Sequence, residues 1–152
     1  TAARYPNALV VGPKTAESRN PHLRLTVGMD DPAYIRSTPE LIAIQLRGVP
    51  FLDETVFFHP ASGSLIAADL LLSACARDHW TWRIAARIFG RYEKVRTPPD
   101  VRMHARASTA VAESIAQMRA LPLQRILVAH ADPITDRPVQ QLAEAWDFAI
   151  AS

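Results

Sequence analysis

Two residues that can bind a metal ion or move a proton each follow an apolar run of this sequence. Asp69 follows Ser64-Leu65-Ile66-Ala67-Ala68, and His130 follows Ile126-Leu127-Val128-Ala129. A carboxylate and an imidazole are common zinc ligands. If each run is a buried strand, a polar group at its end is costly unless something pairs with it. We therefore expect Asp69 and His130 to lie close together, as a metal site or, equally, as a structural hydrogen-bonded pair.

The runs that carry these residues are predicted to be strands. Residues 55–59 are aromatic and β-branched, residues 60–63 have turn chemistry, and residues 64–68 form a second apolar run, which together predict a β-hairpin. Both faces of the second strand are apolar, so we expect it to be buried on both sides. Ligands of open α/β sheets gather beyond strand ends, which is where Asp69 and His130 stand.

The rest of the first half also favours strands. Short apolar runs occupy residues 8–11, 23–27 and 41–46, and Pro-rich and Gly-rich turns separate them. After Asp69 the pattern becomes helical. The stripe Val111, Ile115 and Met118 predicts one helix. A last amphipathic helix is predicted to pack through the following residues: Val139, Leu142, Trp146 and Ile150.

The most unusual helical pattern surrounds residues 80–90. Trp80, Ile84 and Ile88 recur at every fourth position, and Gly90 is a suitable helix end. An arginine stripe, which we expect to be mostly exposed, follows the same helix: Arg83, Arg87 and Arg91. A solvated face is the favoured interpretation of this stripe. The alternative is docking to an anionic partner or to lipid headgroups.

Composition limits the class of protein. The 152 residues suit a single domain over residues 1–152, and the net charge of +2 is too small to argue for nucleic acid. The single Cys75 excludes an internal disulfide framework and is expected to be a small core residue. No apolar run approaches the ~20 residues that span a bilayer. We expect a cytoplasmic protein that is incomplete at its N-terminus, since it begins with Thr1.

Several segments resemble a known family. They are Phe57-Phe58-His59-Pro60, Ser64-Leu65-Ile66-Ala67-Ala68-Asp69, Arg125-Ile126-Leu127-Val128-Ala129-His130 and the opening Tyr5-Pro6-Asn7-Ala8. Their order, a hairpin, helices, a late strand and a final helix, resembles the C-terminal half of the metallo-β-lactamase fold, and within that superfamily the DUF4336 family. The resemblance implies an α/β fold that is half of an αββα sandwich, with one apolar sheet face in need of a cover.

The resemblance also implies roles for two residues. In that superfamily the Asp that ends this hairpin strand bridges two metals and the His that ends the late strand is the last ligand, which makes Asp69 and His130 the expected metal ligands. The superfamily's His-x-His-x-Asp-His signature is absent here and would lie upstream of Thr1. A catalytic zinc normally has three protein ligands. Zinc or another divalent metal is therefore expected only if the missing N-terminal half supplies further ligands.

Two functions follow as expectations. The first is a metal-dependent hydrolase of unknown substrate, of which this chain is a fragment. The alternative is a non-catalytic structural or interaction subunit of a larger complex. A second chain or a second copy is expected to cover the exposed sheet face, nucleic acid is not expected as a partner, and contact with a membrane surface is the less favoured interaction.

Overall fold

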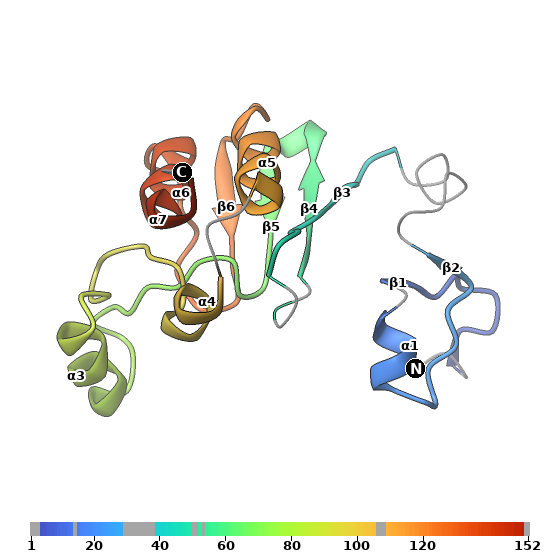
Figure 1. Ribbon diagram of the computed structural model, residues 1–152, viewed down its shortest axis with the longest axis horizontal. Helices are drawn as coiled ribbons and strands as arrows, with labels where there is room; N and C mark the ends of the chain where they lie inside the picture. The colour runs from blue at the N-terminus through green and yellow to red at the C-terminus, as the bar shows by residue number, and fades with distance from the viewer. Residues whose placement is uncertain are drawn as a thin grey trace. The chain divides into compact units, whose positions relative to one another are not determined.

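The computed structural model describes residues 4–13, 15–28, 39–49, 52, 54–105 and 109–150, with the backbone alone for Ile150. Contacts divide the chain into two compact units, Thr1–Ala43 and Ile44–Ser152, which are taken one at a time. The single domain over residues 1–152 stays a prediction. The described residues form a mixed α/β structure with two sheets and six α-helices (Figure 1), as the sequence predicts at this coarse level. None of the helices in these ranges is long and apolar enough to cross a membrane.

The first unit has short strands. It holds β1 (Val11–Gly12), α1 (Thr15–Arg19) and β2 (Val27–Gly28), and β1 runs parallel to β2. The strands predicted over residues 8–11 and 23–27 are much shorter than expected. These runs are poorly covered: Leu9 is exposed, and α1 buries none of its residues.

The second unit is built on a four-stranded sheet with the order β3-β4-β5-β6. Its strands are β3 (Ile42–Gln45), which runs across the boundary of the units, β4 (Thr55–His59), β5 (Ser64–Ile66) and β6 (Arg125–Leu127). Its helices are α3 (Trp80–Ile88), α4 (Pro99–His104), α5 (Thr109–Arg119), α6 (Pro138–Ala145) and α7 (Asp147–Ile150). Figure 1 shows α5, α6 and α7 beside the sheet and α3 apart from it.

The predicted hairpin is confirmed. Strands β4 and β5 are antiparallel with Phe58 opposite Leu65, and a 3₁₀ turn η2 (Pro60–Ser62) and Gly63 connect them. Leu65 is fully buried, but Ile66 is 38% exposed. The prediction that this strand is buried on both faces is therefore wrong.

The two faces of the sheet differ in their cover. One row across β4, β5 and β6 belongs to the core and is at most 2% exposed: Phe58, Leu65 and Ile126. On the opposite face Phe57, Ile66 and Leu127 stand in register across the same strands and are half-buried or exposed. An apolar row thus lies on a sheet face that the described residues cover only in part.

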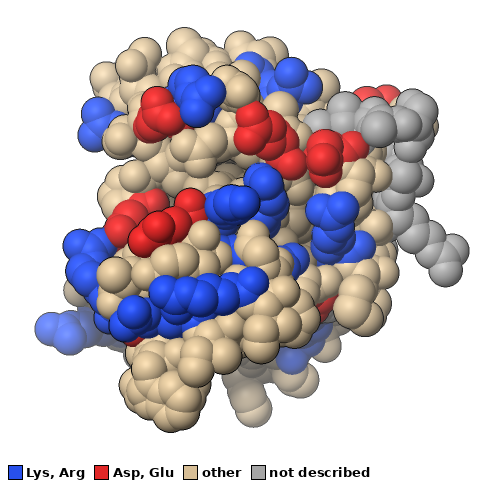
Figure 2. All heavy atoms as spheres, turned by 90° about the vertical axis from the view of Figure 1, so that its left-hand side faces the viewer, with Lys and Arg blue, Asp and Glu red and all other residues tan. Residues whose placement is uncertain are grey.

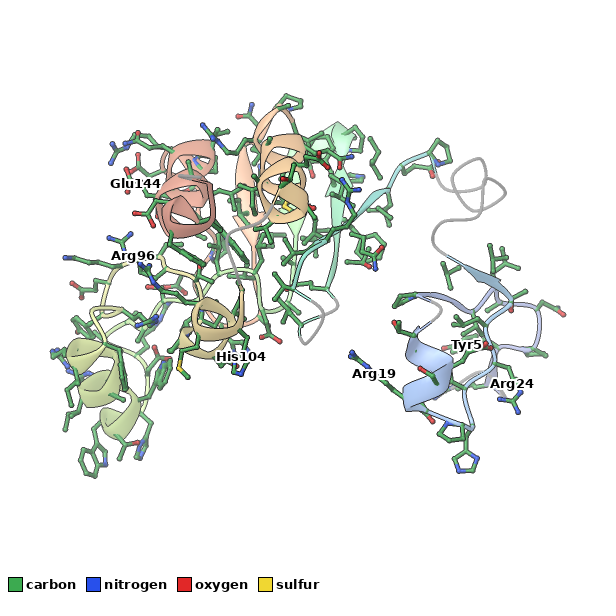
Figure 3. All side chains as sticks on the ribbon, viewed as in Figure 1. Tyr5, Arg19, Arg24, Arg96, His104 and Glu144 are labelled. Carbon is green, nitrogen blue, oxygen red and sulfur yellow. The ribbon has the colours of Figure 1, made fainter. Side chains whose placement is uncertain are left out.

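The C-terminal helices close the core on the covered face, and their side chains fill the space against the sheet (Figure 3). The buried residues of α5 include the predicted stripe Val111, Ile115 and Met118. Leu142 and Trp146 are fully buried, and Val139 packs against the core, as the sequence predicts. The side chain of Ile150 lies outside the described residues.

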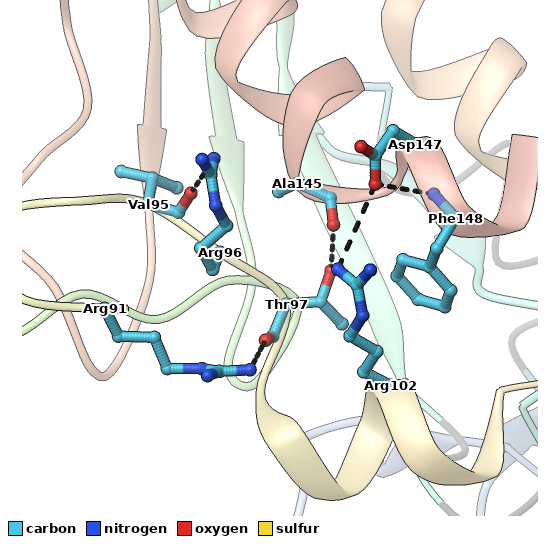
Figure 4. Close-up of polar contacts among 8 residues, drawn as sticks. All are labelled: Arg91, Val95, Arg96, Thr97, Arg102, Ala145, Asp147 and Phe148. Atoms are coloured by element: carbon cyan, nitrogen blue, oxygen red, sulfur yellow. Dashed lines mark hydrogen bonds and ion pairs between the residues drawn. The ribbon is translucent and has the colours of Figure 1, made fainter. Parts of the chain in front are cut away.

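The predicted last helix is divided at Trp146 into α6 and α7. The Thr97 hydroxyl donates a hydrogen bond of 2.5 Å to the carbonyl oxygen of Ala145 (Figure 4), so this carbonyl bonds to a side chain from a distant loop. The Ala149 N–H instead donates to the Trp146 carbonyl at 3.0 Å, which tightens the last turn. The interruption thus has a tertiary cause.

Helix α3 ends as predicted, and its recurring apolar residues are exposed. Gly90 follows it with a φ of 65°. Ala86 is the one buried residue of this helix, while Trp80 and Ile88 are 63% and 75% exposed. Arg91, expected to be exposed, is buried: its guanidinium donates to the carbonyl oxygens of Phe89 and Thr97, the latter drawn in Figure 4. The arginine stripe is therefore not continuous on the surface.

Candidate functional site

Asp69 and His130 follow two neighbouring parallel strands, β5 and β6, and their side chains lie in contact. Strands β5 and β6 pair Ile66 with Leu127, and each pair in the ladder differs by 61 positions (127 − 66 = 61). Beyond the strands this register is lost, because a parallel bridge pairs His130 with Leu72 and leaves Asp69 in the intervening loop. The side chains still meet, with His130 Nε2 3.1 Å from Asp69 Oδ1. The expected proximity of the two residues is confirmed.

Their surroundings differ from the expectation. Neither residue ends a buried strand, because β5 ends at Ile66 and β6 at Leu127. The side chains of Asp69 and His130 are 49% and 63% exposed. The cost of burying an unpaired polar group is thus not what brings them together. The backbone does so: the Ala129 N–H donates to the Ala68 carbonyl at 3.2 Å, just before the pair.

A buried carboxylate holds the backbone beneath the pair. Glu54 is 6% exposed and accepts hydrogen bonds from the Ala68 N–H at 2.6 Å and from the Asp69 N–H at 3.2 Å. Backbone groups that leave a sheet need partners of this kind. Glu54 therefore fixes the loop that presents Asp69, and reasoning from the sequence missed it. An acidic residue before a strand is ordinary, and no sequence signal separates Glu54 from its neighbour Asp53.

The environment of Glu54 raises the pKa of its carboxyl above the ordinary value of 4.5. Burial is the largest cause, because it removes the charged form from water. The charge of Asp69 also raises the pKa, whereas the hydrogen bonds from Ala68 and Asp69 lower it.

Asp69 and His130 line a cleft of about 1280 Å³. Three segments of the second unit form its walls, residues 69–82, 95–101 and 129–141, together with Leu52. Further carboxylates line it: Asp78, Asp100, Asp132 and Asp136. An ion pair between Arg77 and Asp132 joins two of these walls. The pair thus lies in a cleft large enough for a small ligand, whose usual pockets are roughly 300–1,000 Å³.

Cys75 is not the core residue that the sequence predicts. It is only half-buried and lines the cleft. The Cys75 N–H donates a hydrogen bond to Asp78 Oδ2 at 2.7 Å, and this bond closes a turn of the backbone. Hydrogen bonding between Arg77 and the Cys75 side chain is the largest cause that raises the pKa of Arg77. The loop after Leu72 thus points a thiol toward the cleft.

Of the described histidines of the second unit, His130 alone lines the cleft, and the other three have local partners. His59 Nδ1 is 2.7 Å from the Ser62 hydroxyl, and His79 Nδ1 is 2.8 Å from the Thr81 hydroxyl at the start of α3. His104 Nδ1 is 2.8 Å from the Asp100 carbonyl, and its ring points away from the sheet (Figure 3).

Within the described ranges, no three His, Cys, Asp or Glu side chains converge on a point that could hold a metal ion. Asp69 and His130 are thus two side chains of the kind that bind zinc, and the described residues supply no third ligand beside them. Comparison with known proteins adds no further assignment, because no family model and no curated protein matches this sequence.

Proposed function

We propose that this chain is part of a metal-dependent hydrolase of the metallo-β-lactamase fold, in which Asp69 and His130 are two metal ligands. The observation that carries the proposal is their contact at 3.1 Å in an open cleft, in the segments that follow the paired strands β5 and β6. Sequence resemblance to the DUF4336 family supports the same two residues. The substrate class is left open.

The donor atoms fit a zinc ion in type and spacing. Zinc takes imidazole nitrogen at about 2.0–2.1 Å and carboxylate oxygen at about 2.0–2.2 Å, so two ligand atoms of a tetrahedral ion lie about 3.4 Å apart. The observed 3.1 Å between His130 Nε2 and Asp69 Oδ1 is close to that separation. Two ligands hold zinc weakly, so further ligands are assigned to a segment outside this sequence or to a second chain.

The sheet supports a fold with another half. The row of Phe57, Ile66 and Leu127 is apolar and only partly covered. In a sandwich of two sheets such a face packs on a second sheet about 10 Å away. We assign the cover of this face to the missing half of the αββα sandwich.

Each residue of the pair then has a defined role. When bound, the metal supplies Lewis-acid polarisation and a water of lowered pKa. Asp69 and His130 present their oxygen and nitrogen to one point at the wall of the cleft, and Glu54 keeps the backbone of Asp69 in place. The cleft holds the substrate beside that point.

Zinc titration of the isolated chain and of a longer protein that includes the preceding segment tests this proposal. We expect weak zinc binding by the isolated chain and stoichiometric binding by the longer protein. Asp69→Ala and His130→Ala should each weaken binding by about tenfold or more, since even outer partners of a metal site are worth roughly 10–100-fold. Asp136→Ala, another carboxylate that lines the cleft, is the matched control and should change little.

Two results would contradict the proposal. One is tight zinc binding by the isolated chain that neither substitution affects, because other residues would then be the ligands. The other is a longer protein that binds no divalent metal. That second result would favour the alternative function, a non-catalytic interaction subunit, for which the exposed apolar residues of α3 are the supporting observation.

A further inference from the structure

Helix α3 presents apolar side chains to solvent along one side. Trp80, Ile84 and Ile88 are exposed and recur at every fourth position, and Phe89, just past the helix, is exposed as well. Single exposed apolar residues are ordinary, but a contiguous group on one helix marks a surface that binds something. Trp82, by contrast, lines the cleft. We call Trp80, Ile84 and Ile88 the α3 apolar face.

The segment that carries this face is basic and has no acidic residue. Residues 79–92 contain Arg83, Arg87 and Arg91 and neither Asp nor Glu. At about 100° per residue, Arg87 lies only about 60° around the helix from Ile84. Arg87 is exposed, and its guanidinium lies 3.6 Å from the centroid of the Tyr92 ring. Figure 2 shows many Lys and Arg side chains, with some Asp and Glu among them, over the middle and lower part of this side of the molecule, above an uncharged tip.

We propose that α3 docks on an anionic lipid surface, with the α3 apolar face in the interface and the exposed Arg87 at the headgroup phosphates. An interfacial helix combines a wide apolar side, a basic side and low overall hydrophobicity, and Trp is frequent in it. Long Arg side chains beside such a face reach back to the headgroups. The proposal is independent of the metal site.

The charges disfavour the other occupants. Two copies of α3 that met through this face would bring their Arg87 side chains together, and the nearest carboxylates along the chain, Asp78 and Glu93, lie beyond the two ends of the helix. Like charges at a contact oppose association. A neutral protein surface would leave the guanidinium of Arg87 without a counter-charge, whereas lipid phosphates supply one.

Flotation with lipid vesicles tests the proposal on the whole chain. The probes are vesicles of phosphatidylcholine alone and of phosphatidylcholine mixed with phosphatidylglycerol. We expect binding to the anionic vesicles to be tighter by about fivefold for each arginine at the surface. Brominated phosphatidylcholine should quench the fluorescence of Trp80, and Trp80→Phe should remove more of this quenching than Trp82→Phe, because Trp82 lines the cleft and Trp146 is fully buried.

Three substitutions separate the apolar and charged contributions. Ile88→Asp, at a side chain that is 75% exposed, should weaken binding by about tenfold or more. Met103→Asp is its control, on an equally exposed apolar residue of α4 that is 80% exposed, and should have little effect. Arg87→Gln should weaken the affinity for anionic vesicles by about fivefold and leave the affinity for neutral vesicles unchanged. Arg119→Gln on α5 should weaken the affinity for anionic vesicles much less.

Two results would overturn the proposal. One is that the protein does not bind anionic vesicles. The other is that Ile88→Asp and Met103→Asp weaken binding equally, since the general basicity of the protein would then explain the binding. A dimer in sedimentation velocity that Ile88→Asp abolishes, without lipid binding, would assign the face to a second copy. Matched melting midpoints of the variants exclude unfolding as the cause of lost binding.

Discussion

At the scale of single residues, the sequence identifies the pair but not its support. Asp69 and His130 could be chosen because each follows an apolar run, and in the structure their side chains lie 3.1 Å apart. The premise of burial was wrong, since both side chains are largely exposed. Glu54 could not be found in this way, because its role depends on backbone N–H groups that become its neighbours only after the chain folds.

Glu54 makes stability depend on pH. Its raised pKa means that the folded chain binds this proton more tightly than the unfolded chain does. The free energy of unfolding therefore falls as the pH rises from the ordinary value of 4.5 through the raised pKa. The loss is about 1.4 kcal/mol for each unit by which the pKa is raised. Glu54→Gln should remove this decline while its amide oxygen still accepts from Ala68.

Urea unfolding over a pH series, with a chelator present, measures this dependence. Glu113→Gln, at an exposed carboxylate that pairs with Arg47, is the control and should keep the decline of the wild type. Equal slopes for the wild type and Glu54→Gln would show that Glu54 is not the group responsible.

At the scale of elements, local patterns predict what local chemistry determines. The hairpin of β4 and β5 follows from residue types and turn chemistry, and the end of α3 follows from Gly90. The division of the last helix at Trp146 depends on Thr97, which is 48 residues away from its partner Ala145. The side of α3 that is exposed depends likewise on packing, because periodicity defines a face without saying what covers it.

The turn between β4 and β5 depends on Gly63. Its φ of +58° favours glycine, and an added Cβ would lie 2.5 Å from Gln124 Cγ and 3.0 Å from the Pro122 carbonyl oxygen. Gly63→Ala should destabilise the fold by about 1–2 kcal/mol for the left-handed backbone and by roughly 1–3 kcal/mol more for the crowding.

Gly90 separates these two causes. It has a φ of +65°, but nothing lies within 4 Å of an added Cβ. Gly90→Ala should therefore cost the backbone term alone, about 1–2 kcal/mol. Chemical denaturation of both variants measures the difference. Equal losses would mean that Gln124 moves aside without cost.

At the scale of the whole molecule, the C-terminal helices and the cleft are coupled through Trp146. This side chain is fully buried, and its Nε1 donates to the carbonyl oxygen of Leu70 at 3.3 Å. Leu70 directly follows Asp69 in the chain. The residue that joins α6 to α7 thus also supports the loop that presents the candidate ligand, which no stretch of sequence shows by itself.

Trp146→Ala should destabilise the second unit by about 3–5 kcal/mol, because it removes a large buried ring and leaves a cavity. Trp146→Phe keeps most of the ring and loses the hydrogen bond to Leu70, so it should cost about 1–2 kcal/mol. Trp80→Ala, at an exposed tryptophan, is the control and should stay within about 0.5 kcal/mol of the wild type. Denaturant unfolding followed by circular dichroism measures all three.

If Trp146 supports the Asp69 loop, Trp146→Phe should also speed hydrogen exchange at the Ala68 and Asp69 amides, which donate to Glu54. If exchange at these amides matches the wild type, Trp146 stabilises the core but does not support the loop, and Glu54 alone supports it.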